Sequence, residues 1–327
     1  MADLAIIIVS YNSARWLVPC LSSVYANAGD AELDVIVVDN ESVDGSAELV
    51  EREFPEARVL RCENHGFAYG NNRGILAADA PFLLFLNADT EILDGTLSGL
   101  LEELRLRPSV GLVGCRQLTS DGDVYPTIRR FPNAARLFFE ALGSEHLPFR
   151  AGWLGERELD LAVYDREVEC DWTSGSFMLA RREAVLGAGL MDERFFMYCE
   201  EPDLCLRIKR GGWSVRHLPA MTILHHAGKA GWNPRLVAQD AYARRQYMQK
   251  HFSPVHRALG LSAFALGHVA RAALGSREPA GRRERKLASR SALRTLAGLQ
   301  PPPFGEPPLH PLALDGERQT RISPIPK

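Results

Sequence analysis

The sequence predicts an α/β fold in which a mostly parallel sheet is flanked by helices and followed by a helical extension. Four apolar runs rich in β-branched residues lie before residue 90, each ends in polar residues, and helix-prone stretches separate them. Strands that alternate with helices form parallel sheets through right-handed crossovers. Two further helix-like segments lie late in the chain and supply the extension.

The predicted strands are LAIIIVSYN, LDVIVVDNES, ARVLRCEN and PFLLFLNAD, and the helices between them are expected at residues 14–25, 46–53 and 68–77. The fourth strand contains five consecutive large apolar residues, Phe82 to Leu86, which indicates burial on both faces of the sheet. Polar residues follow every strand. Because ligands of such sheets bind outside the carboxyl ends of the strands, these residues are expected to form a site.

Beyond Gly111 the pattern weakens into turns and short runs. Helices are expected at residues 235–250 and 255–274. The second is amphipathic, since His256, Arg257 and other polar residues interrupt its apolar positions, and it is too polar to span a membrane. Residues 301–327 contain eight of the twenty prolines and are expected to be unstructured.

The composition is that of a soluble protein, with 46% hydrophobic and 24% charged residues. Six scattered cysteines without a CxxC pair favour reduced thiols, and the first apolar run is too short for a signal peptide. The expected location is the cytoplasm or the inner face of the cell membrane. Residues 254–327 hold 12 Lys and Arg against 5 Asp and Glu and therefore carry a net charge of +7, whereas residues 1–253 carry −10. The acidic body makes nucleic acid a poor candidate for a partner.

The residues at the strand ends favour a nucleotide-diphosphate ligand. A dinucleotide site would need G-x-G-x-x-G after the first strand, but Ser10 to Ala14 contain no glycine, and no P-loop motif occurs. Asp39, after the second strand, can accept hydrogen bonds from a base, and Tyr11 can stack on it. Asp89, after the fourth strand, can hold a divalent cation that bridges two phosphates.

Six motifs in order resemble those of family 2 inverting glycosyltransferases with the GT-A fold, especially bacterial rhamnosyltransferase-like members. The motifs are IIIVSYN, VIVVDNESVDGS, NHGFAYGNNRG, LFLNAD, WTSGSFMLARR and FFMYCEEPDLCLR. The resemblance covers roughly residues 4–230. It implies a catalytic domain at residues 1–235, followed by a helical extension at 236–300 and a Pro-rich tail at 301–327.

The resemblance also implies roles for individual residues. Tyr11, Asp39 and Asn72 match nucleotide-contacting positions, and Asn12 and Asn40 flank two of them. Asp89 matches the final, metal-binding acid of the D-x-D motif, with His225 as a further ligand for Mn²⁺ or Mg²⁺. Glu201 matches the catalytic base. Two positions depart from the family pattern: Asn87 replaces the first Asp of D-x-D, and Glu200-Glu201 replaces the usual Glu-Asp pair.

Each of these assignments competes with a structural role. Pro202 suits the first position of a helix, so Glu201 is also expected as its N-cap, and Glu200 is the neighbouring candidate for the base. Trp172 suits either the core or the apolar face of a sugar, with Gly175 and Ser176 permitting close approach of that sugar. His225 and His226 are expected to point to opposite faces of a strand, so that only one reaches the metal. Gly70 and Gly74 suit close packing of a helix.

The resemblance therefore implies metal-dependent, inverting transfer of a sugar to a hydroxyl of a cell-surface glycan or polyprenyl-linked acceptor. The preferred donor is dTDP-rhamnose, and UDP-galactofuranose, UDP-GlcNAc and UDP-glucose remain open. A sugar-1-phosphate nucleotidyltransferase is the first alternative from another class, although residues 10–20 lack its basic, glycine-rich loop. The second is a non-catalytic nucleotide-sugar sensor, which would need Asp39 and Asp89 but not Glu201.

Overall fold

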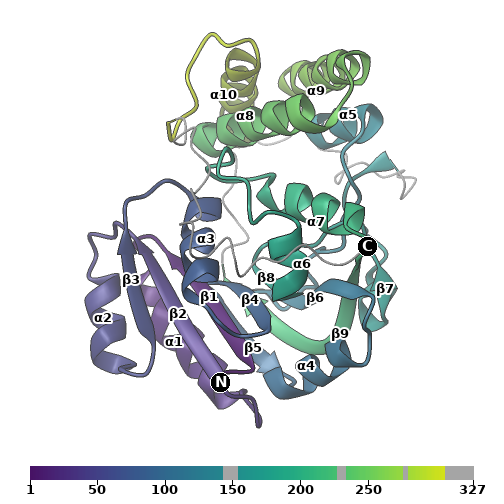
Figure 1. The fold of residues 1–327 in the computed structure, drawn as a ribbon. Helices are drawn as coiled ribbons and strands as arrows, with labels where there is room; N and C mark the ends of the chain where they lie inside the picture. Colours follow the sequence, from purple (N-terminus) through teal and green to yellow (C-terminus); the bar gives the residue numbers. More distant parts are fainter. Residues whose placement is uncertain (143–153, 227–232, 275–278, 306–327) are drawn as a thin grey trace.

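The computed structural model describes residues 1–142, 154–226, 233–274 and 279–305. Within them nine strands form one sheet in the order β3-β2-β1-β4-β8-β6-β9-β5, with β7 paired to β9 (Figure 1). The strands are β1 Leu4–Ser10, β2 Leu33–Asn40, β3 Arg58–Cys62, β4 Phe82–Asn87, β5 Thr90–Asp94, β6 Val110–Thr119, β7 Val168–Glu169, β8 Phe177–Arg181 and β9 Ser214–His225.

The first half of the sheet confirms the predicted parallel arrangement. Strand β1 pairs in parallel with β2 and β4, and β2 pairs in parallel with β3. The connecting helices are α1 Ala14–Ala26, α2 Ser46–Glu53 and α3 Phe67–Ala77. Each helix begins within one residue of its predicted start, because the apolar runs and the polar clusters between them mark these boundaries clearly.

Two apolar cores cover the two faces of the sheet. In β1, Leu4, Ile6 and Ile8 belong to one core with α1, whereas Ala5 and Ile7 belong to the other with α3. Both sets are fully buried, as the continuous apolar run predicted. Helix α4 (Leu97–Arg105) joins the first core, and α6 (Arg182–Gly187) and α7 (Glu200–Arg210) join the second.

The second half of the sheet is mixed rather than mostly parallel. Strand β8 pairs antiparallel with both β4 and β6, and β9 pairs antiparallel with β5 and β7 but parallel with β6. The ten-residue strand β6 falls in the region where the sequence pattern weakens. Strand β9 carries His225 to the same edge as the start of β5, where Thr90 and His225 are register partners.

Four helices form a bundle at the top of Figure 1, beside α7 and far from strands β1 to β3. They are α5 Ala134–Leu142, α8 Pro234–His251, α9 Pro254–Leu274 and α10 Pro279–Leu296. Helices α8 and α9 match the predicted segments closely. The bundle also recruits α5 from within the predicted catalytic segment: Leu137 and Ala141 share a core with residues of α8, α9 and α10.

An ionic cluster joins the bundle to helix α7 beside the sheet. Asp203 in α7 is fully buried, and its carboxylate contacts Lys250 and His251 of α8 at 2.6 Å each. Arg207 of α7 contacts the same carboxylate. Burial by itself raises the pKa of Asp203, but the hydrogen bond from His251 and the charges of Arg207 and Lys250 outweigh it and lower the pKa to about 2.

None of the described helices combines the length and apolarity needed to cross a membrane. All six cysteines are free, as predicted. Nearly all of the predicted unstructured tail, residues 306–327, lies outside the described residues. A side chain at Gly74 would lie 2.4 Å from Ile7 Cγ2 and one at Gly70 would lie 2.9 Å from Asn40 Oδ1, so the packing role predicted for both glycines is confirmed.

Candidate active site

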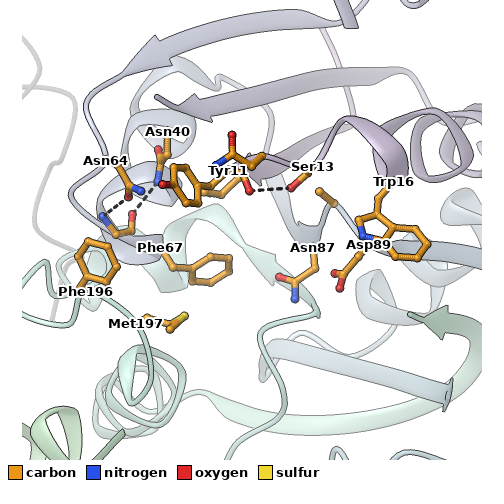
Figure 2. A pocket seen from close by; sticks show the side chains of 14 residues that line it. Tyr11, Ser13, Trp16, Asn40, Asn64, Phe67, Asn87, Asp89, Phe196 and Met197 are labelled. Atoms are coloured by element: carbon orange, nitrogen blue, oxygen red, sulfur yellow. Dashed lines mark hydrogen bonds between the residues drawn. The ribbon is translucent and has the colours of Figure 1, made fainter. Parts of the chain in front are cut away.

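A cleft of about 370 Å³ opens at the carboxyl ends of β1, β2 and β4, where the polar residues after the predicted strands indicated a ligand site (Figure 2). Its lining combines aromatic, amide and carboxylate groups. The lining residues are Val9, Tyr11, Asn12, Ser13, Trp16, Asn40, Asn64, Gly66, Phe67, Asn87, Ala88, Asp89, Phe196 and Met197.

The loop after β1 is held in place by the loop after β2. Asn12 has a left-handed backbone with φ of 52°. Its amide donates to Ser42 Oγ at 2.9 Å, and its Oδ1 accepts from the amide of Val43 at 2.9 Å. These bonds leave the neighbouring Tyr11 side chain at the cleft with 56% of its surface exposed. An exposed aromatic ring on a fixed loop is suited to stacking on a flat ligand.

Asp39 has an unused oxygen at the end of β2. Its Oδ1 accepts from the amide of Ser42 at 3.0 Å, whereas its buried Oδ2 has no partner among the described residues. Its neighbour Asn40 is fully engaged, since Nδ2 donates to the carbonyl of Gly66 at 3.0 Å and Oδ1 accepts from Cys62. Asn40 therefore shapes the cleft wall, whereas Asp39 is 4% exposed, is not among the lining residues, and has one buried oxygen without a partner among the described residues.

Asn87, Asp89 and His225 meet where β4 ends. Asp89 Oδ1 lies 3.4 Å from His225 Nε2, and Asn87 Nδ2 lies 3.5 Å from the same nitrogen. Two ligands of an octahedral cation at about 2.1 Å lie about 3 Å apart, so the Asp89–His225 pair can bind one ion. No third His, Cys, Asp or Glu completes the pair, since no group of three or more such residues that could hold a metal occurs among the described residues. Substrate oxygens or water would therefore complete the coordination of such an ion.

The two neighbouring histidines have different partners, as their positions predicted. His225 faces Asp89, whereas His226 Nε2 bonds to Glu91 and its ring stacks on Trp16 with centroids 4.6 Å apart. The amide of His226 also donates to the carbonyl of Asp89 at 2.9 Å, which fixes the end of β9 beside the turn that carries Asp89. His226 thus acts as support, and His225 is the histidine available to a metal.

Glu200 and Glu201 occupy the first two positions of α7, so the N-cap is Cys199 and not Glu201 as the sequence predicted. Tyr198 and Cys199 have φ of 73° and 67°, two left-handed non-glycine residues in succession. Such conformations are costly and persist where the surroundings enforce them. Burial raises the pKa of both carboxyls, and for Glu200 the charge of Glu201 raises it further.

The loop before β8 connects Glu201 to the end of β4. The amide of Gly175 donates to Glu201 Oε1 at 3.2 Å, and the carbonyl of Ser176 accepts from the amide of Asn87 at 3.1 Å. Two adjacent residues thus touch both the candidate base and the candidate metal region. A side chain at Gly175 would lie 2.9 Å from Glu201 Oε1, so the close approach requires glycine.

Two predicted site residues have other partners. Trp172 is buried in the second core, and its Nε1 donates to the carbonyl of Arg130 at 3.0 Å. Asn72 is buried and does not line the cleft; its amide donates to Glu193 and to the carbonyl of Met191 at 2.9 Å each. The structure therefore gives both side chains a packing role and does not bring them to the cleft.

Several cleft residues were missed by the sequence analysis. Phe196 and Met197 precede the strained pair before α7 and line the cleft, below Tyr11 and Asn64 in the view of Figure 2. The amide of Phe67 donates to the carbonyl of Phe196 at 2.7 Å, so the start of α3 holds this segment. Both residues lie inside the motif FFMYCEEPDLCLR, and this position was the available signal.

Comparison with known proteins shows the family. The model of glycosyl transferase family 2 matches residues 5–163. The chain is 30% identical over 244 residues to the N-acetylglucosaminyl-diphospho-decaprenol L-rhamnosyltransferase of Mycobacterium tuberculosis, an alignment that spans 71% of this chain and 78% of the relative. The chain belongs to glycosyl transferase family 2. This glycosyltransferase is also 25% identical over 230 residues to rhamnosyltransferase WbbL of Escherichia coli, spanning 68% of this chain and 83% of WbbL.

Solved structures support the GT-A fold of the glycosyltransferase. The mannosyltransferase PcManGT of Pyrobaculum calidifontis, in complex with GDP-Man and Mn²⁺, has a TM-score of 0.55 at 17% identity over 91% of this chain and 88% of its own. GalNAc-T7, with UDP, GalNAc and Mn²⁺, has a TM-score of 0.59 at 12% identity over 91% of this chain and 56% of its own. The predicted fold is thereby confirmed.

Proposed function

We propose that this glycosyltransferase transfers a sugar from a nucleotide-diphospho-sugar to a hydroxyl of a lipid-linked glycan, with inversion at the anomeric carbon and with help from a divalent cation. The observation that carries the proposal is the Asp89–His225 pair, 3.4 Å apart at the end of a buried strand and beside a cleft that exposes Tyr11. A carboxylate and an imidazole at this spacing suit Mn²⁺ or Mg²⁺.

The donor nucleotide would occupy the cleft between β1 and β2. Tyr11 would stack on the base, and Asp39 would use its unpaired Oδ2 to accept a hydrogen bond from it. Asp89 and His225 would hold the cation, whose chemistry is to neutralise the charge that develops on the leaving diphosphate. Because Asn87 carries no charge, Asp89 supplies the only carboxylate of this motif.

Glu201 would act as the general base. Its carboxylate would accept the proton of the acceptor hydroxyl while that oxygen forms a bond to the anomeric carbon. The bond from that carbon to the diphosphate oxygen breaks on the opposite face, which inverts the configuration. Burial raises the pKa of Glu201, and a base with a raised pKa accepts a proton more readily than an ordinary carboxylate. Glu200 is the alternative base.

The names of the relatives guide the choice of substrates. The mycobacterial relative is an L-rhamnosyltransferase for N-acetylglucosaminyl-diphospho-decaprenol, and WbbL is also a rhamnosyltransferase. We therefore propose dTDP-rhamnose as donor and a GlcNAc-diphospho-polyprenol as acceptor. UDP-galactofuranose, UDP-GlcNAc and UDP-glucose are the alternative donors.

The proposal is tested by measuring transfer to GlcNAc-diphospho-polyprenol with each donor, in Mn²⁺, in Mg²⁺ and in EDTA. dTDP-rhamnose should give the highest kcat/KM, and EDTA should abolish transfer. Asp89→Ala should lower kcat/KM on the order of 10²–10³-fold, because loss of a charged metal ligand removes several kcal/mol of stabilisation. Asp79→Ala, which removes an exposed carboxylate far from the cleft lining, is the matched control.

Two results would contradict the proposal. Unchanged transfer by Asp89→Ala in Mn²⁺ would remove the metal assignment. Formation of dTDP-rhamnose from dTTP and rhamnose-1-phosphate, without transfer to any acceptor, would identify a nucleotidyltransferase instead.

A further inference from the structure

Helix α9 exposes a stripe that is apolar except for one serine, which we define as Val255, Leu259, Ser262, Leu266, Val269 and Ala273. The exposed fractions of its four largest side chains are 68% for Val255, 55% for Leu259, 59% for Leu266 and 51% for Val269. The members recur every three or four residues, so they lie along one face of the helix. At a rise of 1.5 Å per residue, the α9 stripe is about 27 Å long.

The α9 stripe does not contribute to the packing of the bundle. The opposite face of α9 contains Gly260, Phe264 and Gly267, which are buried. A side chain at Gly260 would lie 2.8 Å from Met248 Sδ of α8, and one at Gly267 would lie 2.5 Å from Ala141 Cβ of α5. These close contacts determine which face of α9 packs against the bundle. The apolar residues of the stripe lie on the other face, where the packing of the bundle does not require them.

Helix α10, which packs on α9, exposes a basic stripe, which we define as Arg283, Lys286, Leu287, Arg290 and Arg294. These residues are three or four positions apart and share one face of α10. The buried face of the same helix carries Ala288, Ser289, Ala292 and Thr295. Among the described residues from 254 to 305, Glu284 is the single acidic side chain, so the charge of this surface is strongly positive.

Both helices lie at the edge of the bundle farthest from strands β1 to β3 (Figure 1). Helix α9 packs on α5 and α8, and α10 packs on α8 and α9. A surface that combines exposed leucine and valine with arginine and lysine matches the chemistry of an anionic bilayer, where apolar side chains enter the acyl boundary and basic side chains meet lipid phosphates.

We propose that the α9 stripe and the α10 basic stripe together form a docking surface for an anionic lipid bilayer. The surface would hold the catalytic cleft near a membrane without a spanning helix. A second copy of the chain fits less well, because a two-fold contact centred on α9 would bring the two basic α10 stripes close together, where like charges repel. This inference does not depend on the identity of the donor or the base.

The test is co-sedimentation of the full chain with vesicles of phosphatidylcholine, with and without phosphatidylglycerol, at low and high salt. The wild type should bind the anionic vesicles and lose binding as salt rises. Leu259→Glu/Leu266→Glu should weaken binding more than tenfold. Arg283→Gln/Lys286→Gln/Arg290→Gln should weaken it on the order of 100-fold, about fivefold per charge removed.

Matched controls separate this inference from the proposed function. Leu106→Glu/Leu161→Glu alters two leucines that are 74% and 51% exposed and lie outside the bundle, so it should bind vesicles like the wild type. All variants should keep the melting temperature and the wild-type transfer to a water-soluble acceptor. Vesicle binding tests the surface even where no transfer is detected.

Either of two outcomes would overturn the inference. The first is absence of binding by the wild type, or equal binding by the wild type and Leu259→Glu/Leu266→Glu. The second is a wild-type dimer in sedimentation velocity that becomes monomeric in Leu259→Glu/Leu266→Glu, which would make the α9 stripe an interface between two copies.

Discussion

Replacing Gly175 by alanine should displace the candidate base while leaving the fold intact. The new Cβ would lie 2.9 Å from Glu201 Oε1 and 3.0 Å from Glu201 Cγ. Carbon and oxygen atoms in contact are normally about 3.5 Å apart, so the two groups must separate by about 0.5 Å. The Glu201 carboxylate is the end of a flexible side chain and can move more easily than the loop backbone.

The consequence should appear in catalysis rather than in stability. A displaced carboxylate also loses the 3.2 Å hydrogen bond from the amide of Gly175, which orients it. Misplacement of a catalytic group by about 1 Å can cost 10²-fold, so a shift of about half that size should lower kcat roughly tenfold or more. The free energy of unfolding should change by less than about 1 kcal/mol, because the crowded atom can move aside.

The assay is steady-state transfer of the sugar, together with donor affinity and urea unfolding. Gly187→Ala is the matched control, because a side chain at Gly187, the last residue of α6, meets no atom within 4 Å. We expect a lowered kcat with unchanged donor affinity for Gly175→Ala and wild-type values for Gly187→Ala. A normal kcat for Gly175→Ala would show that the position of Glu201 is not critical and would refute the reasoning.

Three further predictions concern stability and pH. Asp203→Asn should lower the free energy of unfolding by about 3–5 kcal/mol at neutral pH, since Lys250, Arg207 and His251 lose their buried partner. Because the pKa of folded Asp203 is about 2, below its ordinary value of 3.8, this stabilisation is present above about pH 4 and is lost as pH falls through 2. If the difference in free energy of unfolding between the wild type and Asp203→Asn stayed constant over that range in urea unfolding, this prediction would be contradicted. Gly74→Ala should destabilise the chain by about 1–3 kcal/mol, because its Cβ would lie 2.4 Å from Ile7 Cγ2 inside the core; equal urea midpoints would refute this. Since burial raises the pKa of Glu201, kcat should fall with decreasing pH at a midpoint above 4.5, and a midpoint at or below 4.5 would disagree.

The strands, helices and cleft position of the first 90 residues could be predicted because their signals are local. A run such as Phe82 to Leu86 is buried on both faces of the sheet, Asp39 is the second-last residue of β2, and Asp89 lies two residues beyond β4. The rule that ligands bind at the carboxyl ends of such strands then places the cleft without knowledge of tertiary contacts.

The rest depended on contacts between distant segments. Strand β6 pairs with residues of β8 and β9 that lie more than 60 positions later in the chain, so the sequence around β6 gave little indication of a strand. Asn72 was expected at the nucleotide from its place in a family motif, but its amide donates to Met191 and Glu193 instead. Trp172 likewise finds its hydrogen bond in the core.

The N-cap of α7 shows a limit of local rules. Pro202 suggested that the helix begins there, yet α7 begins at Glu200. The two residues before it, Tyr198 and Cys199, have left-handed backbones, which side chains of these types rarely adopt. Tertiary contacts hold this segment, including the bond from Phe67 to Phe196. Glu201 follows Tyr198 and Cys199 and accepts a hydrogen bond from the amide of Gly175, so the segment that local propensity missed leads directly to the candidate base.

The most direct test of the central claim is the transfer rate of Glu201→Gln, measured beside its donor affinity. The substitution preserves the size of the side chain and removes the proton acceptor. We expect kcat to fall by about 10²–10⁴-fold, the usual contribution of a general base, with donor affinity unchanged. Near-normal turnover would contradict the assignment of Glu201 as the base and would direct the same measurement to Glu200.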